Sequence, residues 1–318
     1  MLAHFRRCAC AFFAAETEKT WRRARRPGML WEFVSLTPLP APAHYFPVRV
    51  EPFRMRSGLV RFGTDFGNGA TDRQFFPRDD QRGRYLTEKA NILARHPLRH
   101  QSNIQDASDE LALSAVAEFM RSTLRLEWGQ DAPQAFDLRL LGTELQEDFV
   151  VLRRLPSGKD RVVTVHVCFP SGWRPEQLVG RSFSEIHGAI PQIEEVLRSA
   201  EHFVNAMVQR GPYVRFVWTV CADDALDHHP EQGGRASWSQ RTGRAFLRVE
   251  RQVSVPFPGH SASLFLIRTY LTAFSSLSKS ERVALASALE LMPPVIRAYK
   301  HLEEAVPRAI ELLLSLPE

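Results

Sequence analysis

Hydrophobic and polar residues alternate with a period of two in several segments of the chain, which is the pattern of β-strands that have one buried face. The strands predicted in this way cover residues 136–142, 148–155, 161–169, 213–220, 245–255 and 261–271. The last two are joined by the short segment PFPGH, which favours a β-hairpin. Because consecutive strands lack intervening helices, the sheet is expected to be antiparallel.

Apolar residues recur every three or four positions in two other segments, 106–127 and 192–209, and this period predicts helices that cover a sheet. Ser278 and Glu281 form a capping box, so a helix is expected from there to Met292, where two prolines end it. A last helix is expected over 295–315, with Pro307 inside it. Together these elements predict an α+β fold.

Charge is concentrated at the start of the chain. The first 30 residues carry seven basic and two acidic side chains, which equals the whole net charge of +5. The rest is therefore balanced and has no excess charge with which to attract nucleic acid. Residues 1–40 are expected to be disordered, either as a basic leader, which leaves organellar targeting open, or as a translation start placed too far upstream. The proline-rich segment 37–47 is expected to be an extended linker into the main domain.

Composition excludes several classes of protein. Four irregularly spaced cysteines form no disulfide framework, so a reducing, cytoplasmic compartment fits best. No apolar run is long enough to span a membrane. Two short motifs are misleading: GNGATD at 67–72 is expected to be a turn, and GHSAS at 259–263 lacks the glycine and the helix of a nucleophile elbow. DDALDHHPE at 223–231 is expected to be a solvated loop, with metal binding as the alternative.

Two arginines are predicted to lie on apolar faces of the hairpin. Alternation places Arg251 on the same face as leucine and valine, and Arg268 repeats this arrangement on the paired strand. One interpretation is structural: a buried ion pair, or a guanidinium that reaches the sheet edge. The other is functional: an apolar cavity in which arginine holds an anionic group. The pattern leaves both open.

Several motifs, taken together, resemble the family of the haem-dependent oxidative N-demethylase α subunit. They occur in the order CFPSGW (168–173), IHGAIP (186–191), RFVW (215–218), RVERQ (248–252) and LFLIRTYL (264–271). Weaker similarity extends upstream through PFRMRSGL (52–59), RYLTEKANIL (84–93) and LQEDF (145–149). The resemblance covers about residues 45–275, which leaves 276–318 as C-terminal helices packed on that domain.

The resemblance implies a PAS-like antiparallel sheet with flanking helices that binds haem b. It implies an oxidoreductase, a monooxygenase that uses O2 to remove a methyl group from a small secondary or N-methylated amine. Electrons would come from NADPH through partner subunits that carry FMN and an iron–sulfur cluster, since this chain has no motif for either. The alternative, from a different class, is a non-catalytic haem or small-ligand sensor.

The resemblance also suggests roles for individual residues. His187 is the candidate haem-iron ligand, with Cys168 as the alternative. The propionates would be held by Arg251, Arg248 and Arg268, and Trp173 is expected to pack over the cavity. The candidates for contacting a protonated amine or for relaying protons are Glu250, Asp148 and Tyr270.

The sequence departs from the family pattern at four positions. Val217 stands in place of asparagine, Leu178 in place of lysine, Ala189 in place of proline, and Val253 in place of threonine. The loss of polar groups at the first two positions is compatible with haem binding but puts amine oxidation in doubt.

Overall fold

The computed structural model describes residues 38–53, 56–104, 106–232, 236–238 and 244–317. Contacts within the chain separate two units, Met1–Pro40 and Ala41–Glu318. The helices and strands of the described residues all lie in the second unit, and they form the α+β organisation that the sequence predicted. The basic segment of the first 30 residues lies outside the described part of the chain.

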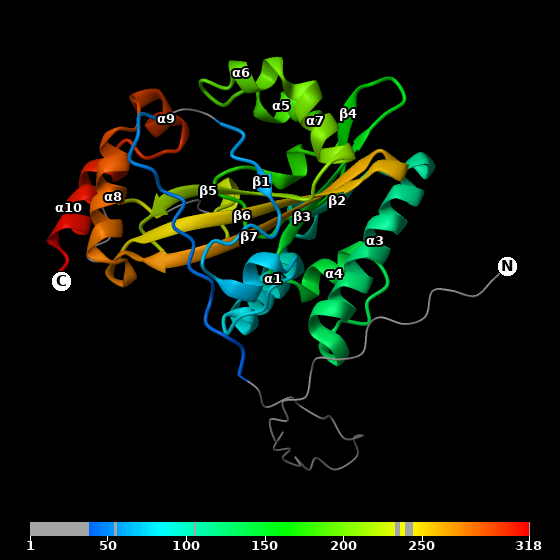
Figure 1. Ribbon diagram of the computed structural model, residues 1–318, viewed down its shortest axis with the longest axis horizontal. Helices are drawn as coiled ribbons and strands as arrows, with labels where there is room; N and C mark the ends of the chain where they lie inside the picture. Colours follow the sequence, from blue (N-terminus) through cyan, green and yellow to red (C-terminus); the bar gives the residue numbers. More distant parts are fainter. Residues whose placement is uncertain (1–37, 54–55, 105, 233–235, 239–243, 318) are drawn as a thin grey trace, which may run out of the picture. The chain divides into compact units, whose positions relative to one another are not determined.

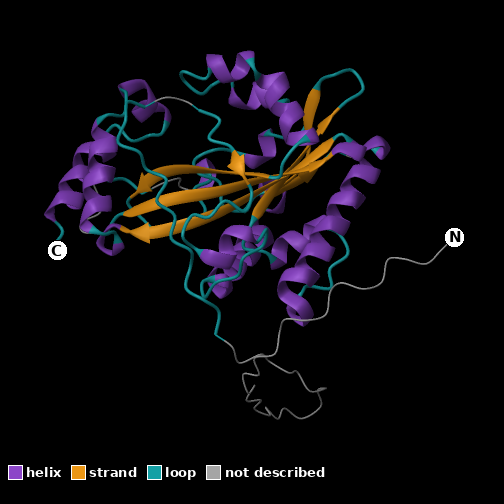
Figure 2. Ribbon diagram, viewed as in Figure 1, coloured by secondary structure: helices purple, strands orange, loops and turns teal. Residues whose placement is uncertain are grey.

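One antiparallel sheet of seven strands organises the second unit (Figure 2). Its strands lie in the order β1-β5-β6-β7-β3-β4-β2. They are β1 (Val60–Arg61), β2 (Gln101–Asn103), β3 (Asp148–Arg154), β4 (Asp160–His166), β5 (Tyr213–Cys221), β6 (Phe246–Phe257) and β7 (Ala262–Ala273). The predicted hairpin is confirmed: β6 and β7 pair along their whole length and are joined by a 3₁₀ turn at Pro258–His260.

Helices cover both faces of this sheet. Figure 1 shows α1 (Arg82–Arg95), α3 (Ala107–Trp128) and α4 (Leu138–Glu144) on one side, and α5 (Phe183–His187), α6 (Glu194–Arg198) and α7 (Ala200–Gln209) on the other. The short α2 (Pro97–His100) leads directly into β2. The C-terminal helices are α8 (Lys279–Glu290), α9 (Pro294–Tyr299) and α10 (Ala305–Ser315). Among the described residues, no helix combines the length and hydrophobicity that crossing a membrane requires.

The two helix predictions with the strongest local signals are confirmed. In α3, Val116, Met120 and Leu124 are fully buried, as their spacing predicted. Helix α8 begins after Ser278, whose side chain accepts a hydrogen bond from the backbone N–H of Glu281 while the Glu281 side chain returns to the Ser278 backbone. This capping box satisfies two N–H groups at the start of the helix that would otherwise have no partner.

The strand predicted over 136–142 is wrong, because the segment forms helix α4. Leu138, Leu141 and Leu145 all pack into the core, and their spacing of three and four residues is that of a helix. Asp137 caps the helix by accepting a hydrogen bond from the backbone N–H of Leu140 at 2.8 Å. The segment FDLRLLG contains three leucines within four residues, so it fits the period of a strand as well as that of a helix.

The helices predicted over 192–209 and 295–315 are each divided in two. The first is interrupted at Ser199, between α6 and α7. The second is interrupted before α10, where His301 adopts a left-handed backbone conformation with φ 54° that a continuing helix excludes. Pro307 lies in the first turn of α10, where its missing N–H breaks no helical hydrogen bond.

The segment 223–231 is a loop, as predicted, but it is packed rather than solvated. His228 and His229 are fully buried and Asp223 is nearly so. His228 Nε2 lies 2.8 Å from Asp223 Oδ1, and His229 Nε2 lies 3.2 Å from Glu176 Oε2. Polar contacts with neighbouring carboxylates therefore replace the solvent that the polar composition suggested.

Candidate functional site

The two sides of the sheet are defined here by the side chains that point to them. Antiparallel partners point to the same side, so Arg251 on β6 and Arg268 on β7, which are direct partners, mark one side, called the arginine face. Glu250 and its β5 partner Val217 mark the opposite side, called the histidine face because helix α5, which ends at His187, packs on this side through Phe183 and Ile186. The predicted site residues divide between these two faces.

The arginine face carries the two arginines that the sequence singled out. Both are almost completely buried, with exposures of 2% and 1%. Towards one strand end they border a core cluster that includes Val249 and Tyr270, and towards the other a cluster that includes Val253 and Leu266. The predicted alternation is therefore confirmed, and two like charges lie opposite each other in an apolar setting, which is unfavourable without compensating groups.

Hydrogen-bond acceptors compensate only part of the unfavourable burial of the Arg251–Arg268 pair. Arg268 donates from Nη2 to Asp79 Oδ2 at 2.6 Å, and Arg251 donates to the carbonyl oxygen of Gln74 at 2.9 Å. Within the described residues, Nε and Nη1 of Arg268 have no hydrogen-bond partner. The Arg268 guanidinium lies 4.5 Å from the ring centre of Tyr85 and 5.3 Å from that of Tyr270, so aromatic faces supply part of its stabilisation.

Glu147 provides a second acid near this pair. It is 1% exposed, and no described group donates a hydrogen bond to either carboxylate oxygen. Burial raises the pKa of Glu147 to about 7, although the nearby charges of Arg268, Lys89 and Arg251 act in the opposite direction. Glu147 is consequently poised between its neutral and charged forms near physiological pH.

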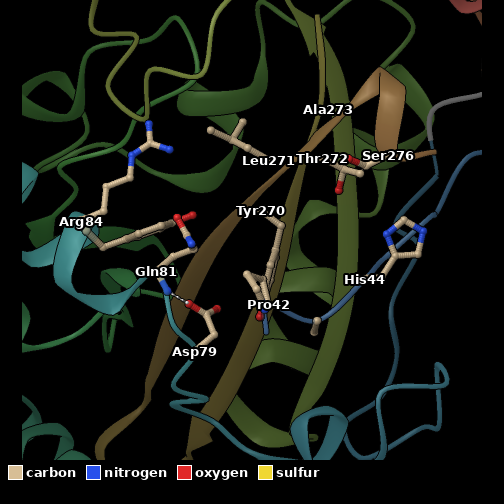
Figure 3. Close-up of a pocket in the computed structure, with 12 residues that line it drawn as sticks. Pro42, His44, Asp79, Gln81, Arg84, Tyr270, Leu271, Thr272, Ala273 and Ser276 are labelled. Atoms are coloured by element: carbon tan, nitrogen blue, oxygen red, sulfur yellow. Dashed lines mark hydrogen bonds between the residues drawn. The ribbon is translucent and has the colours of Figure 1, made fainter. Parts of the chain in front are cut away.

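A pocket of about 330 Å³ opens beside Asp79 and Tyr270 (Figure 3). Arg84 and His44 lie on opposite sides of it, with Tyr270 between them. Burial raises the pKa of Tyr270 to about 12, so its hydroxyl group is protonated at neutral pH. The lining is Pro42, Ala43, His44, Asp79, Gln81, Arg84, Tyr85, Tyr270, Leu271, Thr272, Ala273 and Ser276.

On the histidine face, His187 ends helix α5. Its Nδ1 lies 2.8 Å from the carbonyl oxygen of Phe183, and its ring stacks on the Phe183 ring with centres 4.1 Å apart. A carbonyl oxygen can only accept, so Nδ1 carries the hydrogen and Nε2 keeps its lone pair. Burial lowers the pKa of His187, and the charge of Arg215 lowers it further. The imidazole is thus neutral and fixed in orientation.

Arg215 and Glu250 are two charged side chains of the central strands on this face. Arg215 on β5 is the strand partner of Gln252, so it points to the same side as Glu250. Burial lowers the pKa of Arg215 and the charge of Glu250 opposes that effect. Among the described groups, the Nε of Arg215 has no hydrogen-bond partner. The sequence analysis did not predict Arg215 as a site residue. Arg215 is the first residue of the RFVW motif, and the alternation of β5 places its side chain on the same face as Val217.

Arg248 also points to the histidine face, away from Arg251 and Arg268. It donates to the carbonyl oxygens of Leu226 at 2.9 Å and Phe169 at 2.7 Å, and to the hydroxyl of Thr269 at 3.3 Å. The three arginines predicted to bind one cofactor are therefore not brought together. Arg248 instead ties the loop after β4 to the loop after β5.

Trp173 and Cys168 lie in the chain segment after β4. Trp173 is half-buried and packs with Leu178 and Ile186 against valines of β3 and β4. Cys168 is fully buried, and burial, reinforced by the charge of Asp148, raises the pKa of its thiol. A protonated thiol is a poor metal ligand unless an ion displaces its proton.

Asp148 belongs to a buried polar cluster at the start of β3. Its Oδ1 lies 3.1 Å from Lys89 Nζ, and its Oδ2 accepts a hydrogen bond from the backbone N–H of Phe169 at 2.8 Å. Ligand atoms of Asp148, His166 and Cys168 lie within 4.8 Å of one another. Lys89 and His166 were not predicted, but Tyr85, Lys89 and Ile92 are spaced along one helix face, and this spacing could have revealed a buried lysine.

A comparison with models of protein families matches residues 121–310 to the family described as "Haem-dependent oxidative N-demethylase, alpha subunit-like". The match covers more than half of the chain and runs from within α3 to within α10. The matched range includes the site residues on β3 to β7 and on α5, such as Arg251, Arg268 and His187. The residues of α1 and of the segments before it, such as Asp79 and Lys89, lie outside the match. The motifs that suggested this family at the level of sequence lie largely inside the matched range.

Proposed function

Given that this chain belongs to the family of haem-dependent oxidative N-demethylase α-subunit-like proteins, we propose that it holds a haem against the histidine face. We further propose that the bound haem serves the oxidative N-demethylation of a small secondary or N-methylated amine. The fold would then be a PAS-like sheet with flanking helices, and the cofactor haem b. The structural support for this function comes from the histidine face.

The single observation that carries the proposal is the geometry of His187. A haem-ligating imidazole must be neutral, and it is usually oriented by a hydrogen bond from its second nitrogen to a backbone carbonyl or carboxylate. His187 meets both requirements, because Nδ1 is held by the Phe183 carbonyl and burial keeps the ring neutral. Cys168 is less suited, because a cysteine binds a metal as the thiolate and burial favours the protonated form of Cys168. The residues present thus fit His187 as the ligand.

The same face offers a cation and partly uncovered strands. Arg215, Val217, Glu250 and Gln252 are only half-buried although they lie on central strands, so this part of the sheet is not fully covered by helix. Arg215, whose Nε has no hydrogen-bond partner in the described part of the chain, is suited to a propionate. Arg251 and Arg268 are less suited, because they lie on the other side of the sheet from His187.

The cofactor would supply O2 activation, so that the N-methyl group leaves as formaldehyde and the primary amine is released, with NADPH as the electron source and water as the second product of O2. FMN and an iron–sulfur cluster on separate reductase subunits would carry the electrons. Glu250 is the carboxylate placed to attract a protonated amine to this face. Asp148 is less available, since Lys89 and a backbone N–H already occupy it.

Turnover with an added reductase tests the function. Purified chain loaded with haem is mixed with NADPH, a flavin and iron–sulfur reductase, O2 and dimethylamine, and formaldehyde is measured. We expect formaldehyde in proportion to NADPH consumed, and at least a hundredfold less from Glu250→Gln if one charge-assisted contact holds the amine, since each ~1.4 kcal/mol is tenfold. Glu201→Gln, an exposed glutamate on α7, is the matched control. No formaldehyde from haem-loaded wild-type protein with any N-methylamine would contradict the catalytic proposal.

One observation favours the second candidate, a haem-based sensor. Val217, where the family has asparagine, pairs directly with Glu250 and therefore removes a polar group from the proposed site. A sensor would show a haem spectrum that changes on ligand addition, without NADPH consumption. Val217→Asn distinguishes the two: recovery of formaldehyde release in this variant would mean that the wild type has kept the cofactor and lost the reaction.

A further inference from the structure

His166 is an unexplained polar group in the interior of the protein. It is the last residue of β4, is 1% exposed and stacks on Phe149 with ring centres 5.3 Å apart. No described group makes a hydrogen bond to either ring nitrogen. Buried polar atoms without partners are rare in folded proteins, and each one needs an explanation such as a bound ion or an ordered water. The proposed haem site, on the histidine face, does not use His166, whose β3 partner Phe149 points to the arginine face.

The fold holds His166 tightly in this position. A side chain at Gly142 of helix α4 would place its first carbon 2.3 Å from the His166 ring, so only glycine permits the observed packing. The ring is thus held between Phe149 and the α4 backbone. Its rotamer freedom is already lost in the folded state, and a ligand that binds it gains from this preorganisation.

Two further donors meet His166 at the same point. Asp148 and Cys168 are 1% and 0% exposed, and their ligand atoms lie within 4.8 Å of one another and of a His166 ring nitrogen. An ion between three such atoms would need shifts on the order of half an ångström to reach the bond lengths of about 2.0–2.3 Å that zinc makes with nitrogen, oxygen and sulfur. The three residues come from the start of β3, the end of β4 and the segment after β4.

We propose that Asp148, His166 and Cys168 form a binding site for a divalent transition-metal ion of the zinc class. The combination of thiolate, imidazole and carboxylate selects such an ion over magnesium or calcium, which prefer oxygen ligands alone. Binding displaces the thiol proton of Cys168 to solvent, so the ligands contribute two negative charges to one doubly charged ion. A fourth position is left for water or for His100, whose Nε2 has no partner among the described residues.

The Lys89 ammonium could compete with the metal ion for the Asp148 carboxylate. Its contacts show how the carboxylate can bind the ammonium and the ion together. Its Nζ donates to the carbonyl oxygens of Gly142 at 3.1 Å and Glu147 at 2.6 Å and lies 3.1 Å from Asp148 Oδ1. These contacts hold the ammonium on the α1 side of the carboxylate. Asp148 Oδ1 can therefore contact Lys89 and still present its second lone pair to an ion, as an oriented ligand does in many metal sites.

Metal content of the full-length protein tests the proposal. Protein expressed with added zinc is dialysed, and bound metal is measured by mass spectrometry together with far-ultraviolet circular dichroism. We expect about one zinc per chain in the wild type and at least a tenfold lower content in Cys168→Ser and His166→Phe, since losing even a supporting contact costs about 10–100-fold in affinity. Cys221→Ser, at the other buried cysteine, is the matched control and should keep the zinc.

Cobalt provides a second readout that depends on the ligands themselves. Cobalt-loaded wild type should show a thiolate-to-metal charge-transfer band that Cys168→Ser lacks, even if that variant retains some metal through the other ligands. Cys168→Ser differs from the wild type by one atom, so it also covers the case in which His166→Phe fails to fold. Wild-type protein without zinc, or zinc retained equally in both ligand variants, would overturn the site.

The same samples separate this site from the proposed haem site. His187→Ala should lose the haem spectrum and keep its zinc, whereas His166→Phe should lose zinc and keep the haem spectrum. Loss of both signals in both variants would mean that the two histidines serve one centre, and that result would also overturn the proposal.

Discussion

The arginines on the two faces of the sheet differ in the groups that stabilise them. On the arginine face, Arg251 and Arg268 lie opposite each other and depend on Asp79 and on aromatic rings for stabilisation. On the histidine face, Arg248 has backbone carbonyl oxygens as acceptors. Arg215 lies close to a neutral imidazole, and none of the described residues accepts a hydrogen bond from its Nε. The almost fully buried Arg251, Arg268 and Arg248 and the half-buried Arg215 thus represent three different situations. The hydrogen-bond partners, more than burial, distinguish an arginine that supports the fold from one that is available to a ligand.

The largest effect is expected from removing the acid of the arginine pair. Asp79→Ala leaves the Arg268 guanidinium buried without its hydrogen-bonded carboxylate beside Arg251, which typically costs about 3–5 kcal/mol of unfolding free energy. Urea unfolding measures this loss. Asp80→Ala, the exposed neighbouring carboxylate, should change stability by less than about 0.5 kcal/mol. Equal effects for the two variants would mean that Asp79 does not stabilise the pair.

A somewhat smaller effect is expected at Arg248. Arg248→Met leaves the carbonyl oxygens of Phe169 and Leu226 buried without donors, at a cost of about 3 kcal/mol in unfolding free energy. Urea unfolding again provides the measurement, with the exposed Arg95→Met as the control. If Arg248 were instead a propionate ligand, the variant would lose haem affinity while apo-protein stability stayed unchanged.

The next effect is a dependence of stability on pH that originates at Glu147. Its pKa is about 7 in the folded protein and near 4.5 when exposed. The folded state therefore binds more protons between these values, so the contribution of Glu147 is fully present below about pH 4.5 and is lost as pH rises through about 7. A shift of this size corresponds to roughly 3 kcal/mol. The slope of unfolding free energy between pH 5 and 7 should become less negative in Glu147→Gln; an unchanged slope would assign the titration to other groups.

The smallest effect on stability is expected at Arg215. Arg215 is half-buried and its Nε has no hydrogen-bond partner among the described residues, so Arg215→Met should change unfolding free energy by less than about 1 kcal/mol. The same variant should bind haem more weakly, measured by titration of apo-protein with haemin. A stability loss as large as that of Arg248→Met would remove the distinction between the two arginines.

The sequence allowed much of the sheet to be predicted and less of the site. The alternation of Arg251 with valines and leucines specified its face correctly, because a period of two is a direct consequence of strand geometry. The run around Leu141 was misread, since a dense leucine segment fits a strand and a helix equally well. Asp79, Lys89 and His166 were missed because their importance arises from contacts across distant segments, which local patterns do not encode. Their partners became evident only from the folded structure.

The central claim, that the histidine face holds haem through His187, is tested most directly by the visible absorption spectrum of protein expressed with a haem precursor. The wild type and His202→Ala, an exposed histidine on α7, should show a Soret band of equal intensity per chain. His187→Ala should lose the band and Cys168→Ser should keep it. A wild-type protein without a Soret band despite haem supply, or a band that survives in His187→Ala and disappears in Cys168→Ser, would contradict this account.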